Sequence, residues 1–292
     1  MIHVRAACKI NLSLDVLALR SDGYHELSSI VHTVGLWDEL QIVAGQNGFK
    51  SNVDLPDDNL CTRAATRWFE ALGEGAAFST VHISLQKHLP IGAGIGGGSG
   101  NAAAVLLALN ALQAEHSADG IDDEKLHRIA AKLGADVPLF LRGGCQLMEG
   151  IGEKLSPLPP QDFWIVLLKP PVFGDTRAVF RQWDEVQPAS LRATPTLTSA
   201  IRSRDIEKIA ASVGNDLTDA AKQSGQPVEA TLQYLRGSGA IGASLSGSGA
   251  ACFGIFEDKT AARAALAQLQ ASLDAEWFVA AAPLCARGVE IV

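Results

Sequence analysis

The chain is organised around one glycine-rich stretch, which reads Pro90-Ile91-Gly92-Ala93-Gly94-Ile95-Gly96-Gly97-Gly98-Ser99-Gly100-Asn101-Ala102-Ala103-Ala104. An alternating run from 81 to 87 precedes it and predicts a half-buried strand. A run rich in Ala and Leu from 102 to 114 follows it and predicts a helix. A strand, a glycine loop and a helix N-terminus leave backbone N–H groups unpaired and favour an anion, so the stretch predicts a phosphate site.

The density of glycines favours an anion cradle over a simple turn. Six glycines between 92 and 100 cost backbone entropy, whereas one or two suffice for a turn. A hinge or a close helix–strand contact remains the structural alternative. Gly92, Gly94 and Gly97 match the loose dinucleotide pattern, but a polar run from 115 to 120 and a second helix follow where that fold needs a strand ending in an acidic residue. The P-loop pattern fails because no Lys-Ser or Lys-Thr follows the glycines.

Length and composition predict two globular domains. The chain has 292 residues, of which 47% are hydrophobic and 19% charged. A net charge of -8 without a Lys/Arg run disfavours nucleic acid and membrane surfaces as partners. Five dispersed cysteines without a C-x-x-C pair indicate reduced thiols, and no apolar run reaches the length of a membrane span. We therefore expect a cytoplasmic protein.

The N-terminal segment predicts a long strand with a polar second face. Apolar residues alternate from Val4 to Val16, while Lys9 and Asn11 project side by side from the other face. A solvated sheet face is the alternative to a functional one. The string Arg20-Ser21-Asp22-Gly23-Tyr24-His25-Glu26-Leu27 follows, and it is either a recognition loop or an ordinary surface turn.

Asp136 is a candidate functional carboxylate. It stands between Ala135 and Val137, two residues before Pro138 and next to an apolar run. It either caps a helix or belongs to a partly dry site.

The rest of the chain predicts alternating helices and strands. Strands are expected at 38–43, 163–169 and 277–282, two more within 242–256, and helices at 59–72, 122–134, around 179–183 and at 199–213, 215–223, 228–236 and 258–273. Glycines and prolines from 150 to 160 predict a boundary between domains 1–154 and 155–292. No zinc-protease or serine-hydrolase motif is present, and the seven histidines lack metal-ligand spacing, so no metal residues are predicted.

Four features, in this order and spacing, resemble the GHMP small-molecule kinase superfamily across essentially the whole chain. They are Lys9-Ile10-Asn11-Leu12, the glycine stretch, Gly134-Ala135-Asp136-Val137-Pro138 and Ser246-Gly247-Ser248-Gly249. The string Asp22-Gly23-Tyr24-His25-Glu26-Leu27 is similar to the branch that acts on a methylerythritol carrying a cytidine diphosphate. The resemblance implies a two-domain α+β fold. Its N-terminal domain would resemble domain 2 of ribosomal protein S5, its C-terminal domain would be ferredoxin-like, and the active site would lie in the cleft between them.

The resemblance also implies an activity and its residues. The reaction would be ATP-dependent phosphorylation of the 2-hydroxyl of that substrate, with Mg²⁺, in the non-mevalonate route to isoprenoid precursors. Asp136 matches the catalytic base and Lys9 the cation beside it. The positions matching ATP-binding residues are Asn59, Lys87, Pro90, Gly92, Gly94, Gly96, Gly97, Gly98, Ser99, Gly100 and Asn101. Those matching acceptor-binding residues are Asn11, Tyr24, His25, Asp136, Thr176, Phe180, Gly247 and Ser248. Of these, Tyr24, His25 and Phe180 would enclose the cytosine: two aromatic faces would sandwich the base, and the backbone and ring of His25 would read its edge.

The chain departs from the family pattern at two positions. The family usually has Ser where this chain has Gly100, and Gly where it has Ala93. The missing hydroxyl puts a metal or phosphate role of that serine in doubt. A kinase for homoserine or mevalonate, a nucleotide-binding module without catalysis and, more remotely, a dehydrogenase binding NAD remain alternatives.

Overall fold

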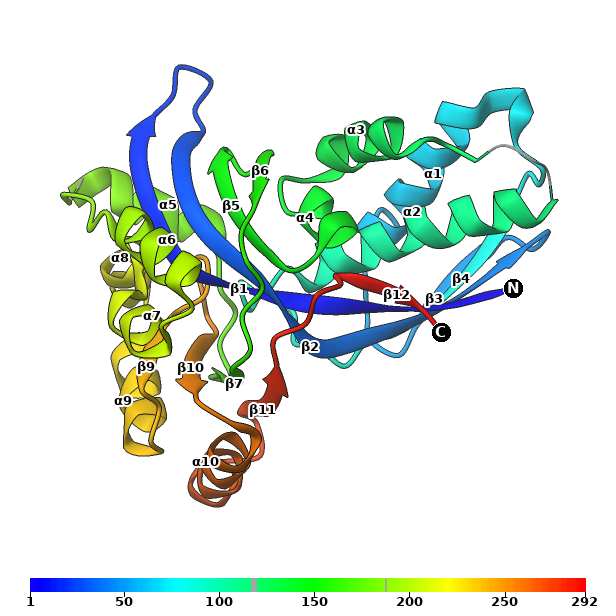
Figure 1. The fold of residues 1–292 in the computed structure, drawn as a ribbon. Coiled ribbons are helices and arrows are strands. Elements are labelled where there is room, and N and C mark those ends of the chain that lie inside the picture. Colours follow the sequence, from blue (N-terminus) through cyan, green and yellow to red (C-terminus); the bar gives the residue numbers. More distant parts are fainter. Residues whose placement is uncertain (117–119, 187) are drawn as a thin grey trace.

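The computed structural model describes residues 1–116, 120–186 and 188–292. It contains two β-sheets with helices packed on them (Figure 1), which confirms the α+β prediction. Residues 117–119, in the predicted polar run, lie outside the described residues. The strands are β1 (Ile2–Leu19), β2 (His25–Ala44), β3 (Gly48–Ser51), β4 (Val81–Gln86), β5 (Cys145–Gly150), β6 (Lys154–Pro157), β7 (Trp164–Lys169), β8 (Gly214–Asn215), β9 (Gly242–Leu245), β10 (Cys252–Phe256), β11 (Phe278–Pro283) and β12 (Val289–Ile291).

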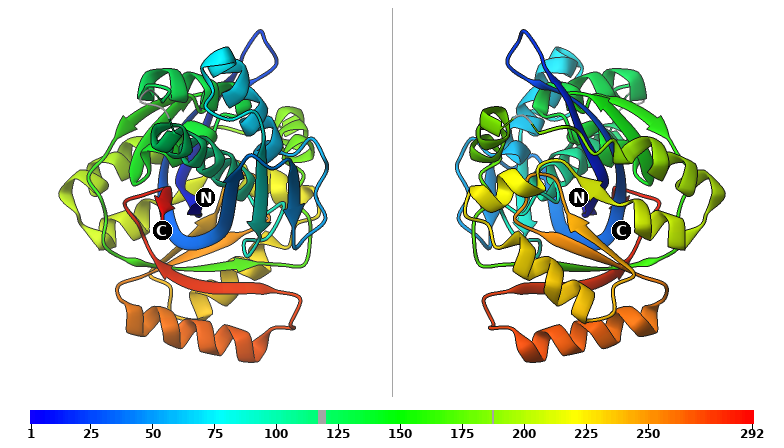
Figure 2. Two further views of the ribbon diagram at one scale, coloured as in Figure 1. Left: turned by 90° about the vertical axis from the view of Figure 1, so that its right-hand side faces the viewer. Right: turned by 90° about the vertical axis from the view of Figure 1, so that its left-hand side faces the viewer.

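Helices cover both sheets. They are α1 (Leu60–Leu72), a single 3₁₀ turn (Gly73–Gly75), α2 (Gly97–His116), α3 (Asp123–Leu133), α4 (Val137–Arg142), α5 (Thr176–Val186), α6 (Ala193–Ser203), α7 (Ile206–Ser212), α8 (Thr218–Gln223), α9 (Val228–Gly237) and α10 (Lys259–Ser272). Helices α1 to α4 pack over the first sheet, whereas α10 lies on the outer face of the second (Figure 2).

Strand β1 runs through the molecule and contributes residues to three hydrophobic cores. The first sheet runs β12-β1-β2-β4-β3, with β5 and β6 attached through β2, and β8 attached to β1. Alternate residues of β1 enter three successive hydrophobic cores: Val4 lies under α1 to α4, Ile10 lies between the two sheets, and Leu14 packs with α5, α8 and α9. The last strand, β12, pairs with β1, which brings the two chain ends together (Figure 1).

The second sheet has a ferredoxin-like arrangement. Its strands occur along the chain as β7, β9, β10 and β11, and they lie side by side in the order β11-β7-β10-β9. Alternation along β7 explains how the sheet is held: Ile165 and Leu167 enter the core between the sheets, while Val166 and Leu168 face the helices outside.

Several sequence-based boundaries were wrong. Strand β2 extends from His25 instead of starting near 38, and α2 begins at Gly97 inside the glycine run instead of at 102. The helix expected at 199–213 is two helices, because Arg204 adopts a left-handed backbone with φ 55° between them. The boundary expected at 154/155 falls within β6, which pairs with β5 in the first sheet, and the boundary itself stays a prediction.

The polar face of β1 is not solvated. Only 4% of Lys9 and 1% of Asn11 are exposed, so the alternative of an ordinary surface face is wrong. A buried lysine and a buried amide each require partners, because an unpaired polar group in the interior is costly.

The five cysteines are free thiols, as the sequence predicts. Burial raises the pKa of Cys61, Cys145 and Cys252 to about 12, so these thiols stay protonated at neutral pH. None of the helices in the described residues combines the length and the apolar character that a membrane span requires.

Gly100 allows helix α2 to approach β1 closely. A Cβ at this position would lie 2.8 Å from the carbonyl oxygen of Ala7, a backbone atom that cannot move aside freely. A Cβ at Gly98, in the same helical turn, would meet Leu60 Cδ1 at 3.5 Å, which is an ordinary van der Waals contact.

We therefore expect Gly100→Ala to lower the free energy of unfolding by about 1–3 kcal/mol through overpacking. Gly98→Ala is the matched control and should be neutral or stabilising by up to about 1 kcal/mol, because alanine favours helix. Urea unfolding measures both, and equal stability of the two variants would contradict the close approach.

His32 is a buried histidine between the two sheets. It is 1% exposed, and its cross-strand neighbours Ile10 and Cys145 belong to the core between the sheets. Its Nδ1 lies 2.9 Å from the carbonyl oxygen of Thr33, while Nε2 has no partner within the described part of the chain. Burial lowers the pKa of His32 from 6.5 to about 4.

Because its pKa is lower in the folded state, His32 should make stability depend on pH. Between pH 6.5 and 4 the unfolded chain binds the extra proton, so the free energy of unfolding falls as the pH falls, by about 3 kcal/mol in total. His32→Leu should remove this contribution. The test is the difference in unfolding free energy between wild type and variant at pH 7 and pH 4.5. We expect that difference to change by about 2–3 kcal/mol, and a constant difference would be the contrary result.

Candidate active site

The glycine loop is held by backbone hydrogen bonds to both halves of the molecule. The N–H of Lys9 in β1 donates to Ile95 at 2.9 Å, and the N–H of Gly174 donates to Gly92 at 2.9 Å. The N–H of Ala251 donates to Ala93 at 3.1 Å. These hydrogen bonds hold the loop in place between the two sheets, so it is not a free hinge.

Positive φ angles give glycine a specific role at two positions of the loop. Gly94 has φ 74°, and a Cβ there would lie 2.3 Å from the carbonyl oxygen of Ser246. Gly96 has φ 69°, and a Cβ there would lie 2.9 Å from the ring of Phe140. Both positions need the left-handed backbone and the absence of a side chain.

A cavity of about 300 Å³ lies against this loop. It is bounded by the first turn of α2, whose N–H groups lack intrahelical partners and whose dipole favours an anion. The predicted ATP residues that line it are Asn59, Lys87, Pro90, Gly92, Gly94, Gly96, Gly97, Gly98, Ser99 and Asn101. Gly100 does not line it, because its N–H donates to Gly96 at 2.9 Å and its Cα faces β1.

A buried ion pair adds a cation at this cavity. Lys87 and Asp38 form it, with side chains 6% and 0% exposed. The same carboxylate accepts the N–H groups of His88 and Leu89 at 2.7 and 2.8 Å. A Cβ at Gly97 would lie 2.9 Å from Lys87 Nζ, so the ammonium sits at the start of α2.

Asn59 has a structural explanation in addition to its place at the cavity. Its side chain accepts the N–H groups of Cys61 and Thr62 and so caps α1. Its Nδ2 donates to Pro56 at 2.9 Å.

Lys9, Asn11 and Asp136 form a compact polar cluster behind the loop. Lys9 Nζ donates to Asn11 Oδ1 and lies 3.7 Å from Asp136 Oδ2. Asn11 Nδ2 donates to Ser29 at 2.9 Å, which fixes the amide. Asp136 stands at the N-terminus of α4 but its side chain makes no capping hydrogen bond. Its carboxylate, 28% exposed, therefore remains available to a ligand.

The turn between β9 and β10 closes this cluster from the second sheet. Ser246 Oγ lies 3.1 Å from the carbonyl oxygen of Gly94, to which it donates, and the Asn11 N–H donates to it at 3.4 Å. A Cβ at Gly247 would lie 3.4 Å from Asn11 Oδ1. Predicted residues from three distant segments thus meet at one point.

Helix α5 joins this cluster to the hairpin of β1 and β2. Its first residue, Thr176, hydrogen-bonds Ser248 through the two hydroxyls at 2.7 Å. One turn later, the ring of Phe180 stacks on His25 with centroids 4.7 Å apart and an interplanar angle of 26°.

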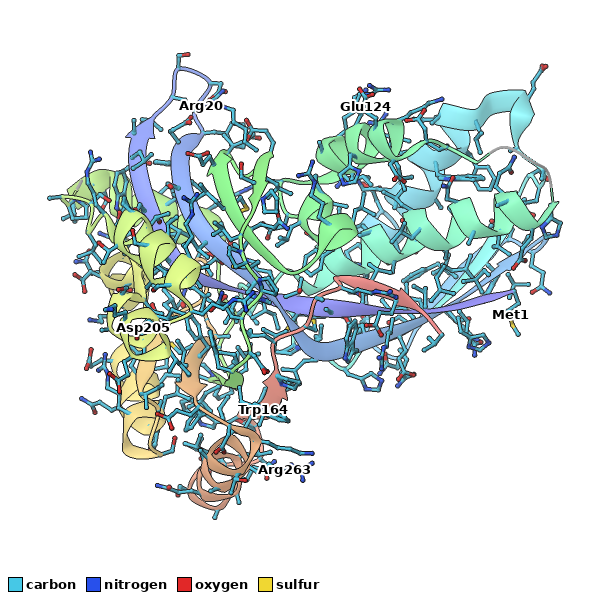
Figure 3. The ribbon with its side chains drawn as sticks, in the orientation of Figure 1. Met1, Arg20, Glu124, Trp164, Asp205 and Arg263 are labelled. Carbon is cyan, nitrogen blue, oxygen red and sulfur yellow. The ribbon has the colours of Figure 1, made fainter. Side chains whose placement is uncertain are left out.

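Tyr24 is not brought against Phe180. It is 60% exposed, next to the hairpin tip where Arg20 projects (Figure 3). In the described residues, Phe180 faces His25, and the cytosine sandwich of Tyr24 and Phe180 stays a prediction. The Arg20 guanidinium, within 2.9 Å of Asp22, lowers the pKa of that carboxyl and holds the turn before Tyr24.

The sequence did not predict four polar residues of the site. Asp38 pairs with Lys87, Ser29 binds Asn11, Ser246 binds Gly94, and Asp184 binds His25. Two of them carried a usable signal. Ser246 belongs to the turn motif 246–249, and Asp184 follows Phe180 by four residues on one helix, the spacing that puts two side chains on one face.

The site suits a cation held mainly by a bound ligand. No group of three or more His, Cys, Asp or Glu side chains in the described residues could hold a metal ion by itself. Asn101 Oδ1 is buried beside the cavity and has no hydrogen-bond partner among the residues that the structure describes, and an amide oxygen is a ligand that Mg²⁺ accepts. Mg²⁺ commonly uses one or two such oxygens together with substrate phosphates.

Comparison with known proteins agrees with this arrangement. The model of the GHMP kinases N terminal domain matches residues 59–144, and that of the GHMP kinases C terminal matches residues 197–275. Proteins named 4-diphosphocytidyl-2-C-methyl-D-erythritol kinase are similar over most of the chain. The one from Moorella thermoacetica is 40% identical over 90% of this chain and 92% of its own length. The one from Geobacter sp. is 36% identical over 96% and 98%.

Solved structures give the same result. A crystal structure of 4-(cytidine 5'-diphospho)-2C-methyl-D-erythritol kinase has a TM-score of 0.80 and 32% identity, covering 97% of this chain and 99% of that one. Homoserine kinase from Cytophaga hutchinsonii has a TM-score of 0.76 at 20% identity, covering 100% and 97%, and shows the fold alone. The chain belongs to the GHMP kinases and, within them, to the family of 4-diphosphocytidyl-2-C-methyl-D-erythritol kinases.

Proposed function

We propose that the chain transfers the γ-phosphoryl group of ATP to the 2-hydroxyl of 4-diphosphocytidyl-2-C-methyl-D-erythritol, a step towards isoprenoid precursors. The names of its relatives support the substrate. One observation carries the chemistry: Lys9 Nζ lies 3.7 Å from the Asp136 carboxylate, and the Lys9 N–H is bonded to the glycine loop. A cation and a base are thereby joined to a phosphate-binding loop.

In the proposed reaction, the substrate hydroxyl oxygen attacks the γ-phosphorus while the bond to the β–γ bridging oxygen breaks and ADP leaves. Asp136 accepts the hydroxyl proton, because its carboxylate is partly exposed and makes no helix cap. Lys9 offsets negative charge on the transferred phosphoryl oxygens. Asn11, held by Ser29, orients the acceptor.

The ATP phosphates would lie along the glycine loop. GHMP kinases use ATP as phosphate donor, and the first-turn N–H groups of Gly97, Gly98 and Ser99 suit its phosphates. Lys87 supplies a cation there, while Asn101 Oδ1 and the Ser99 hydroxyl are the oxygens that would hold Mg²⁺. Bound Mg²⁺ would neutralise charge on the phosphates.

The cytidine end would lie at the hairpin and α5. Tyr24, His25 and Phe180 supply ring surfaces for a base, and Thr176, Gly247 and Ser248 lie between them and the cluster of Lys9, Asn11 and Asp136. In this proposal, the ATP-binding domain ends near residue 154, the acceptor-binding domain follows, and the protein acts in the cytoplasm.

A substrate panel tests the proposed function. The full chain is incubated with ATP and Mg²⁺ and with 4-diphosphocytidyl-2-C-methyl-D-erythritol, homoserine or mevalonate, and ADP release is measured. We expect turnover with the cytidine substrate alone. Turnover with homoserine or mevalonate, or ATP hydrolysis without transfer, would reject the proposal.

We expect Asp136→Ala to lower kcat by about 10²–10⁴-fold, because it removes the proton acceptor. Its fold and ATP affinity should remain near wild type, since the side chain lies outside the cavity that we assign to ATP. Asp205→Ala is the control, because Asp205 caps α7 on the surface (Figure 3). Near-wild-type turnover of Asp136→Ala would rule out the assigned role.

A further inference from the structure

Asp184 makes a direct contact with the predicted base-reading histidine. Its Oδ1 lies 2.7 Å from His25 Nε2. The two residues come from different parts of the fold, since His25 begins β2 and Asp184 lies on α5. The His25 side chain is 8% exposed and that of Asp184 is 35% exposed.

One turn of α5 encloses the His25 ring. Phe180 stacks on its face, Trp183 meets it edge-on with centroids 5.4 Å apart, and Asp184 binds Nε2. These three residues occupy positions i, i+3 and i+4 of the helix and so share one side of it. These contacts fix the orientation of the His25 ring, and Asp184 is the hydrogen-bond partner of its Nε2 atom.

The partner of Nε2 decides what the other ring nitrogen offers. A carboxylate only accepts hydrogen bonds, so in the neutral ring Nε2 carries the hydrogen and Nδ1 presents a lone pair. Within the described part of the chain, Nδ1 of His25 has no hydrogen-bond partner.

An acceptor at Nδ1 distinguishes the two common pyrimidines. Cytosine presents an amino donor at C4, which Nδ1 can accept, whereas uracil presents a carbonyl oxygen there. Nδ1 and the uracil carbonyl oxygen are both hydrogen-bond acceptors, so neither would find a donor in the other, and uracil would bind less well.

We propose that Asp184 is a positioning residue that fixes the Nε2–H tautomer of His25 and thereby sets the preference for cytidine over uridine in the acceptor. This inference rests on the proposed function, because it assumes that the acceptor's base binds at His25. Asp184 itself does not touch the base.

The first measurement needs no substrate. The full chain is labelled with ¹⁵N-histidine, and long-range proton–nitrogen correlations of the His25 ring are recorded, with His25→Gln used for assignment. We expect an Nε2–H ring in the wild type and a mixture of tautomers in Asp184→Ala. Asp184→Asn keeps an acceptor oxygen and should restore the wild-type tautomer, and an unchanged ring in Asp184→Ala would overturn the proposal.

The second measurement compares kcat/KM for the cytidine substrate and its uridine counterpart. Asp184→Ala should reduce the preference for cytidine by about three- to tenfold, the value of one hydrogen bond. It should do so through KM for the acceptor, with kcat and the KM for ATP within about twofold of wild type. Glu185→Ala is the matched control, because it removes the same charge from the next residue of α5 without contacting His25.

The outcomes separate this inference from the proposed function. If the wild type fails to phosphorylate the cytidine substrate, the proposed function fails whatever the tautomer. If the wild type is active but Asp184→Ala keeps its preference for cytidine, the role of Asp184 fails alone. An equal rise in the KM values for acceptor and ATP would show a merely structural contact and would also overturn it.

Discussion

The buried ammonium of Lys9 is the constraint on which the site depends. A charge with 4% exposure is stable only if it is paired, and it finds Asn11 on its own strand and Asp136 at the start of α4. The N–H of the same residue binds the glycine loop. One residue of β1 thus holds a strand, a loop and a carboxylate in fixed relation, which is the preorganisation that phosphoryl transfer requires.

Close backbone approach holds the two halves around this point. The turn after β9 packs against Gly94, and helix α2 packs against Ala7 through Gly100. Such contacts leave no space for side chains, so the glycines serve packing as well as the anion binding that we propose for them. At Gly100 the structure favours the packing role, because its N–H is used within the helix and it lies outside the cavity. Because position 100 lies outside the lining of the cavity, glycine there costs the cavity no ligand.

Sequence patterns predicted the helices, strands and turns that depend on neighbouring residues along the chain. The strand–loop–helix unit, the helices α1, α3 and α10, and the strands of the second sheet follow from period and turn chemistry. The polar residues were harder to interpret, because β1 is buried on both faces and its polar residues therefore resemble a solvated face. Asp38 and Asp184 were missed because their partners, Lys87 and His25, lie 49 and 159 residues away. The resemblance to a known family supplied the pairing of Lys9 with Asp136, but neither of these two.

The most direct test of the account is single-turnover phosphoryl transfer by Lys9→Met, measured together with its affinity for ATP. Methionine matches the length of the lysine stem but carries no charge. If the ammonium serves the transition state, transfer should slow by about 100-fold or more while the ATP dissociation constant changes by less than about tenfold. Transfer at the wild-type rate would contradict the central role of Lys9, as would a loss confined to ATP binding.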